Sequence, residues 1–302
     1  MKHILITGGT GLVGKKLTEL LLSKGYAVAY LSRKKKPFPS VKVYEWNIYQ
    51  KTIEKEAITE AEAIIHLAGA GVADKTWTES YKKEILESRV LSTQLLYETL
   101  EQTQHSVKSF ISASAVGIYG FDTGEQWLDE NSPHGKDFLA DVTEKWETEV
   151  QKIADLGVRT AILRIGIVLA KEGGALPKLL QPIRWGLGAA LGSGKQYMSW
   201  IHIKDLAQMF VFALENEHLK GVFNAVGNKP CTNAELTQAI AQTIHKPLFL
   251  PNVPSFALKL MVGEMAQMVL GGNRVSNEKI LQAGFQYQFP TLQEALKDLL
   301  MQ

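Results

Sequence analysis

The stretch His3-Ile4-Leu5-Ile6-Thr7-Gly8-Gly9-Thr10-Gly11-Leu12-Val13-Gly14 decides the fold of this chain. A short apolar run, typical of a buried β-strand, enters a glycine-rich turn, and an amphipathic helix pattern follows from about Gly11 to Leu22. Glycine permits a tight turn and lets backbone N–H groups approach an anion, while the positive end of the helix dipole faces that anion. The pattern predicts a βαβ unit that binds the pyrophosphate of a dinucleotide. The alternative is that the glycines form only a tight turn between strand and helix and bind no ligand. The expected contacts are Gly8, Thr10, Gly11, Leu12, Val13 and Gly14.

The rest of the first half alternates β-rich runs with helical patterns, which is typical of a parallel sheet with crossover helices. Several strands are almost continuously apolar, as expected where helices cover both faces of the sheet. The prediction is a doubly wound α/β fold. Its expected strands are His3 to Thr7, Ala27 to Ser32, Val41 to Trp46, Ala63 to Leu67, Val107 to Ser112 and Arg159 to Ile165. Its expected further helices are Thr78 to Leu100 and Asp137 to Leu156.

The second half predicts a smaller, mostly helical lobe. We expect a dinucleotide-binding domain over residues 1–165, which 205–228 rejoins, and a substrate lobe over 166–204 and 229–302. The apolar run from Phe256 to Leu270 is too short to span a bilayer. It is interpreted as one packed helix with three methionines on a single face, the alternative being a surface for a partner.

Composition excludes several classes of protein. The 302 residues carry 33 Lys+Arg against 31 Asp+Glu, a formal net charge of +2, which argues against a general polyanion binder. A single cysteine, Cys231, excludes a disulfide framework and a cysteine-rich zinc site. No metal-ligand spacing and no aromatic interleaving of basic residues occurs, so we expect no metal, no nucleic acid and no membrane as partners. The first apolar run is too brief for a signal peptide, and the expected compartment is the cytoplasm.

The end of the second predicted strand selects the type of dinucleotide. NAD-binding proteins place an acid there to hold a ribose hydroxyl, whereas this chain has Ser32-Arg33-Lys34-Lys35-Lys36. A guanidinium can grip a 2′-phosphate in bidentate fashion, so Ser32 and Arg33 are predicted to select NADP. The alternative for the lysines is a solvated loop.

Several motifs together resemble the extended short-chain dehydrogenases/reductases. They are Thr7 to Gly14, His66-Leu67-Ala68-Gly69, Ser112-Ala113-Ser114 and Tyr119-Gly120. More narrowly, the chain resembles the atypical "epimerase family" branch through segments such as Glu87-Ser88-Arg89-Val90 and Met198-Ser199-Trp200-Ile201-His202. This resemblance implies a Rossmann-type sheet with a C-terminal substrate lobe.

The resemblance also implies further cofactor contacts. Asn47 falls where the wider family has an Asp that binds the adenine amino group, and an Asn oxygen could accept that bond. Ala68 and Gly69 would form a floor of small residues under the middle of the cofactor. Arg89 stands where the wider family has a helix asparagine.

The chain departs from the family in its proton-transfer residues. The wider family uses a Tyr-x-x-x-Lys pair on one helix face, where the ammonium lowers the pKa of the phenol. Here Leu139 and Thr143 occupy those positions, and Ala115 occupies the position of the usual serine.

Two interpretations stay open. In the first, the chain is an NADP-dependent oxidoreductase or epimerase on a small polar substrate, with relocated acid/base groups, of which Ser114, Tyr119 and His202 are the candidates. In the second, it is a non-catalytic NADP(H)-binding sensor that acts through a partner. We expect a monomer or a homodimer.

Two further residues have predicted roles. Asp205 is predicted to cap a helix that starts at Leu206. Arg164 is predicted to pair with either an anionic substrate or an internal carboxylate.

Overall fold

The computed structural model of this protein describes residues 2–301. The chain forms two compact units. The first comprises Met1–Ser114, Val142–Leu163 and Ala207–Phe223, and the second comprises Ala115–Asp141, Arg164–Leu206 and Asn224–Gln302. Residues 115–141, within the predicted 1–165 domain, therefore belong to the second unit.

The first unit is built on an eight-stranded sheet, and it confirms the doubly wound α/β fold. In spatial order the strands are β12 (Gly221–Ala225), β8 (Arg159–Ile165), β6 (Ser109–Ala115), β5 (Ala63–His66), β1 (His3–Thr7), β2 (Ala27–Ser32), β3 (Val41–Asn47) and β4 (Thr52–Ile53). The pairings from β6 to β3 are parallel, and β4 runs antiparallel to β3. The central strand β1 buries Ile4, Leu5 and Ile6 in succession, as required of a strand that is covered on both faces.

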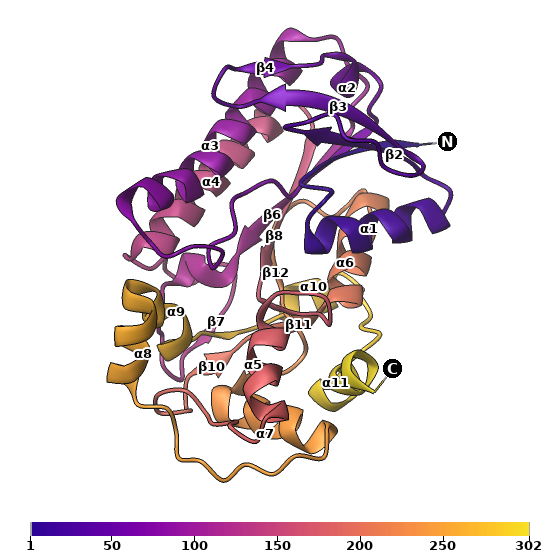
Figure 1. Ribbon diagram of the computed structural model, residues 1–302. Helices are drawn as coiled ribbons and strands as arrows, with labels where there is room; N and C mark the ends of the chain where they lie inside the picture. Colours follow the sequence, from indigo (N-terminus) through magenta and orange to yellow (C-terminus); the bar gives the residue numbers. More distant parts are fainter. Residues whose placement is uncertain (1, 302) are drawn as a thin grey trace. The chain divides into compact units, whose positions relative to one another are not determined.

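Helices cover both faces of this sheet. They are α1 (Leu12–Ser23), α2 (Glu56–Thr59), α3 (Glu79–Gln102), α4 (Phe138–Asp155) and α6 (Ile203–Glu215). Figure 1 shows α3 and α4 together on one side of the strands, with α1 and α6 on the other. The long helix α3 starts where the Thr78 hydroxyl accepts a hydrogen bond from the Tyr81 N–H, which satisfies one orphan donor of its first turn.

The second unit contains short helices and two-stranded sheets. Its helices are the 3₁₀ turn η1 (Val116–Tyr119), α5 (Ala175–Arg184), α7 (Asn233–Thr243), α8 (Ser255–Val262), the 3₁₀ turn η2 (Gly263–Ala266), α9 (Gln267–Leu270), α10 (Glu278–Gln282) and α11 (Leu292–Leu300). Its strands pair as β9 (Ile167–Leu169) with β11 (Trp200–His202), β10 (Tyr197–Met198) with β13 (Cys231–Thr232), and β7 (Trp127–Leu128) with β14 (Arg274–Val275). Reciprocal capping boxes start α7 and α11.

Two sequence expectations about this unit were wrong. The helix expected from Phe256 to Leu270 is divided into α8, η2 and α9, because Gly263 adopts a left-handed φ of +60°. In addition, α8 has no buried residue, and Met261 is 77% exposed, so this segment is no packed helix with one methionine face.

Candidate dinucleotide site

The turn between β1 and α1 requires glycine at two positions. Gly8 has a φ of +69°, and a Cβ there would lie 2.8 Å from the backbone carbon and oxygen of Leu67. A Cβ on Gly14 would lie 2.5 Å from the carbonyl oxygen of Gly8. The first glycine therefore lets the turn approach the end of β5, and the second lets α1 pack against the turn.

The N-terminus of α1 is uncapped. Gly11 is its N-cap residue, has no side chain to offer, and donates its own N–H to the Gly8 carbonyl at 3.0 Å. No side chain caps the first-turn amide groups, which include those of Leu12 and Val13. Thr10 and Gly11 are exposed at the tip of the turn. Unpaired N–H groups and the positive end of the helix dipole thus meet at an exposed turn, which suits an anion.

The end of β2 presents an unpaired guanidinium. Within residues 2–301 no hydrogen bond or ion pair engages the exposed Arg33. Lys35, by contrast, pairs with Glu54 at 2.7 Å. Since β2 is hydrogen-bonded to β1, Arg33 follows the strand adjacent to the one that leads into the glycine turn. The half-buried Ser32 is the last residue of β2.

Asn47, at the end of β3, already uses its side-chain oxygen. That oxygen accepts the N–H groups of Tyr49 and Gln50 at 3.0 and 3.1 Å. An adenine amino group would have to share this oxygen with two backbone donors, because a carbonyl oxygen has two lone pairs.

A buried hydrogen-bond network fixes the loop after β5. The hydroxyl oxygen of Thr7 accepts the N–H groups of Leu67 and Ala68, each at 3.1 Å. Its own proton is therefore free to donate to His66 Nδ1, 2.7 Å away. This leaves the His66 proton on Nε2, which lies 3.1 Å from the Thr93 hydroxyl. Burial, reinforced by the positive charge of Arg89, lowers the pKa of His66 to about 3, so this histidine is neutral at pH 7.

The sequence analysis did not identify Thr7 and His66 as residues that position the loop after β5. The available signal was a polar residue at the end of each of two almost wholly apolar strands, Ile4 to Ile6 and Ala63 to Ile65. In parallel neighbouring strands such residues meet at the same edge of the sheet.

Arg89 lies against the same loop. A Cβ on Gly69 would come 3.0 Å from Arg89 Cζ, so a side chain at this position would press against the guanidinium. Arg89 Nη1 donates to the carbonyl oxygens of Ala70 and Ile85 at 3.0 and 2.9 Å. The guanidinium also lies 5.3 Å from the centroid of the Trp146 ring on α4.

All three acid/base candidates are buried and bonded to internal partners, beginning with Ser114 and Tyr119. Ser114 is 3% exposed and donates to the buried carboxylate of Glu147 on α4. Tyr119, in the second unit, is also 3% exposed and donates to the side-chain oxygen of Asn224 at 2.7 Å. Burial, the largest influence, raises the pKa of Tyr119, although Arg164 opposes the rise.

Arg164 is an internal structural group of the second unit. It is 3% exposed, and its Nη1 donates to the Tyr119 hydroxyl and to the Glu130 carbonyl oxygen, both at 3.1 Å. Both acceptors are neutral oxygens inside the unit, and the predicted pairing of Arg164 with an anionic substrate or an internal carboxylate stays a prediction.

His202, the third candidate, is fully buried in the second unit. Its Nδ1 accepts the N–H of Lys204, and its Nε2 lies 3.2 Å from an oxygen of Asp298. Its ring stacks on Phe289 with centroids 3.9 Å apart.

The expectation that Asp205 caps a helix starting at Leu206 was wrong. The helix α6 begins at Ile203, and the Asp205 carboxylate accepts the backbone N–H groups of Gln288 and Phe289.

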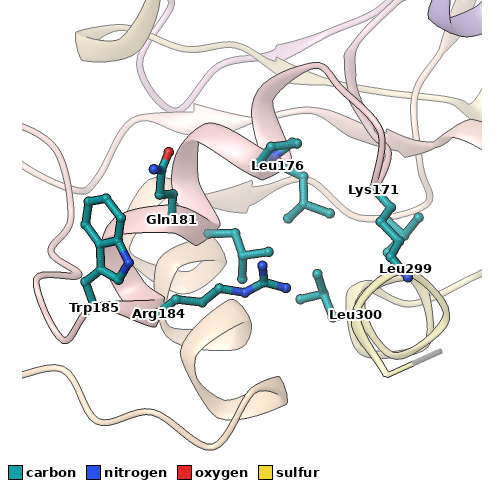
Figure 2. Close-up of a pocket in the computed structure, with 9 residues that line it drawn as sticks. Lys171, Leu176, Gln181, Arg184, Trp185, Leu299 and Leu300 are labelled. Atoms are coloured by element: carbon teal, nitrogen blue, oxygen red, sulfur yellow. The ribbon is translucent and has the colours of Figure 1, made fainter.

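A separate cavity of about 580 Å³ lies between α5 and α11 in the second unit (Figure 2). Figure 2 shows the Arg184 side chain extending across it toward Leu300. Its lining is Lys171, Leu176, Pro177, Leu180, Gln181, Arg184, Trp185, Leu299 and Leu300, none of which the sequence predicted as a site residue.

Residues 2–301 contain neither a cluster of metal-binding side chains nor a helix that could span a membrane. In that range no group of three or more His, Cys, Asp or Glu side chains is placed to hold a metal ion. No helix there has the length and apolarity that crossing a membrane requires.

Comparison with known proteins identifies the family. Residues 4–225 match the model of the NAD dependent epimerase/dehydratase family. The chain belongs to the NAD dependent epimerase/dehydratase family. The predicted resemblance is thereby confirmed, and a domain of unknown function matches residues 253–299 of this family member.

Family members with similar chains come from mammals and bacteria. The epimerase family protein SDR39U1 of Mus musculus is 36% identical over 301 residues, with 98% of this chain and 99% of that protein covered. The crystal structure of human SDR39U1 with NADPH has a TM-score of 0.88 and 34% identity, with 98% of both chains covered. A nucleoside-diphosphate sugar epimerase from Corynebacterium glutamicum has a TM-score of 0.81 and 31% identity, with 99% of this chain and 58% of that chain covered.

Proposed function

We propose that this chain binds NADP(H) and acts as an oxidoreductase or epimerase-like enzyme on a small polar substrate. One observation carries the proposal. An uncapped helix N-terminus stands over a glycine-lined turn, and an exposed, unpaired Arg33 ends the neighbouring strand. The human relative that was crystallised with NADPH, at 34% identity, supports the choice of cofactor.

The residues fit the phosphates of the cofactor. The amide groups around Gly8 to Gly14 would hold the pyrophosphate, since no side chain of the turn or cap occupies their acceptor positions. Arg33 would hold the 2′-phosphate in bidentate fashion. The remaining proposed contacts are Thr10, Leu12 and Val13 at the turn, Ser32 and Asn47 toward the adenosine half, and Ala68, Gly69 and Arg89 beside β5.

The reaction would depend on few protein groups. When bound, the cofactor supplies or accepts a hydride, and the protein orients it. General acid catalysis adds roughly 10²–10⁴-fold, so a chain without the Tyr-x-x-x-Lys pair could still react slowly. Ser114, Tyr119 and His202 stay our candidates for the proton. Each would first have to leave an internal partner, namely Glu147, Asn224 or Asp298.

A second candidate function is a non-catalytic NADP(H) sensor that acts through a partner. The burial of Ser114, Tyr119 and His202 favours it, because a general acid must reach its substrate within hydrogen-bond distance. In either case, we propose that the first unit binds the cofactor and the second the partner or substrate.

Calorimetric titration with NADPH and NADH tests the cofactor. The wild type should prefer NADPH, and Arg33→Ala should reduce that preference about tenfold to hundredfold, as expected for a lost charge-assisted contact. Lys35→Ala is the matched control, because Lys35 is already paired with Glu54, and it should change the preference less than about threefold. An unchanged preference in Arg33→Ala would refute the assignment.

Turnover separates the two functions. The NADPH-loaded protein is incubated with a panel of carbonyl metabolites and sugar nucleotides, and both NADPH oxidation and epimerised products are measured. Turnover of any member supports the enzyme. Tight NADPH binding without turnover across the panel supports the sensor.

A further inference from the structure

The guanidinium of Arg89 carries a positive charge that no carboxylate among residues 2–301 neutralises. Among residues 2–301 its hydrogen-bond acceptors are two backbone carbonyls, those of Ala70 and Ile85, and both bonds use Nη1. The N–H groups of Nε and Nη2 have no hydrogen-bond partner in that range. Burial lowers the pKa of Arg89 to about 10, so the group is still charged at neutral pH.

This charge lies on a defined side of the dinucleotide site. The strand β1, which leads into the glycine turn, has β2 on one side and β5 on the other. Arg33 ends β2 and is our proposed contact for the 2′-phosphate, which belongs to the adenosine half. Arg89 contacts Gly69, in the loop after β5. The nicotinamide half, on the opposite side of the pyrophosphate from the adenosine, would therefore lie toward Arg89.

The guanidinium of Arg89 also lies near α4, the helix that lacks the lysine of the Tyr-x-x-x-Lys motif. Thr143 occupies the lysine position of the Tyr-x-x-x-Lys motif on α4, and Trp146 lies three residues further along the same helix. Residues three apart share a helix face. The guanidinium of Arg89 lies 5.3 Å from the Trp146 ring centroid, so α3 brings a cation to the face of α4 that lacks one.

We propose that Arg89 makes this protein selective for the redox state of its cofactor, so that it binds NADPH more tightly than NADP⁺. The proposal rests on the proposed function, because it requires that NADP(H) is bound. The two forms share the adenosine, the pyrophosphate and the 2′-phosphate. They differ in the positive charge of the oxidised nicotinamide ring, which a fixed guanidinium on that side of the site repels. If the two charges were about 10 Å apart at an effective dielectric constant of about 20, the repulsion would correspond to a preference of roughly tenfold.

The test compares the dissociation constants of NADPH and NADP⁺ by calorimetry in four proteins. The wild type should bind NADPH about tenfold more tightly than NADP⁺. Arg89→Gln should bring the ratio toward one, whereas Arg89→Lys, which keeps the charge, should retain most of it. Arg33→Gln is the matched control. It removes a contact to the 2′-phosphate that both forms share, so it should weaken both and preserve the ratio.

The outcomes separate the proposal from its premise. A wild type without preference, or an Arg89→Gln protein with the wild-type ratio, would overturn the role of Arg89. Failure of both cofactor forms to bind the wild type would instead refute the proposed function. If Arg89→Gln does not fold, as judged by thermal melting, the wild-type ratio still decides: no preference rejects the proposal. In that case Arg89→Met, which has no charge, takes its place: a ratio near one supports the proposal, and the wild-type ratio rejects it.

Discussion

Thr7→Val is the substitution that most directly tests the network beneath the loop after β5. Valine has nearly the shape of threonine, so the change removes the hydroxyl without opening a large cavity. The Thr7 hydroxyl accepts from the N–H groups of Leu67 and Ala68 and donates to His66. The Leu67 N–H keeps a second partner, the Thr7 carbonyl oxygen at 3.1 Å. Two groups are therefore left without a partner: the Ala68 N–H and His66 Nδ1.

An unsatisfied buried donor or acceptor costs about 1–3 kcal/mol. We expect Thr7→Val to lower the free energy of unfolding by about 2–4 kcal/mol, with the smaller value applying if water reaches the half-buried Ala68. Urea denaturation monitored by circular dichroism measures this loss. We also expect weaker NADPH binding, because the loop from Leu67 to Gly69 is our proposed floor for the cofactor.

Thr99→Val is the matched control. Thr99 is buried in the same unit, and its hydroxyl donates to the carbonyl of Leu95 one turn earlier in α3. That substitution leaves no orphan donor, so it should cost less than about 1 kcal/mol. If Thr7→Val destabilised the protein no more than this control does, the network would not hold the loop and the reasoning would be refuted.

Two further predictions concern His66 and Asp298. The folded pKa of His66, about 3, lies below its unfolded value of 6.5, so the unfolded state binds more protons between these values and stability falls as the pH drops through this window. Replacing His66 with Gln should reduce the slope of unfolding free energy between pH 6 and 4 by up to about 1.4 kcal/mol per pH unit, and identical slopes in urea titrations would contradict this. Asp298→Asn removes the ion pair with Lys204 at 2.7 Å and should lower the stability of α11 by about 1 kcal/mol. Hydrogen exchange of the α11 amides measures this loss, and unchanged protection would contradict a stabilising role of this ion pair.

The strand–turn–helix opening could be predicted because its signals are local. The strands at His3–Thr7 and Ala27–Ser32 have the predicted bounds. Glycines and cations that act through the backbone or at an exposed strand end need no distant partner. For the same reason, Arg33 could be singled out from the sequence as a candidate contact for a 2′-phosphate.

The prediction of one packed helix from Phe256 to Leu270 was wrong because burial is not a local property of the sequence. Its apolar content was interpreted as a packed face, but hydrophobicity does not distinguish a buried face from an exposed one. Phe256 and Met261 are 75% and 77% exposed, and a glycine at residue 263 ends α8.

The sequence by itself determined the parallel α/β fold, the glycine cradle, the position of Arg33 and the absence of a Tyr-x-x-x-Lys pair from the helix Phe138–Asp155. Only the tertiary structure decided which polar residues are available for chemistry. Thr7 meets His66 across 59 residues, Ser114 meets Glu147 across 33, and Tyr119 meets Asn224 across 105. A hydroxyl in a sequence can be a catalyst or part of the core. Which of these it becomes depends on the partner that folding brings within hydrogen-bond distance, because a buried polar group without a partner costs more than one that is bonded.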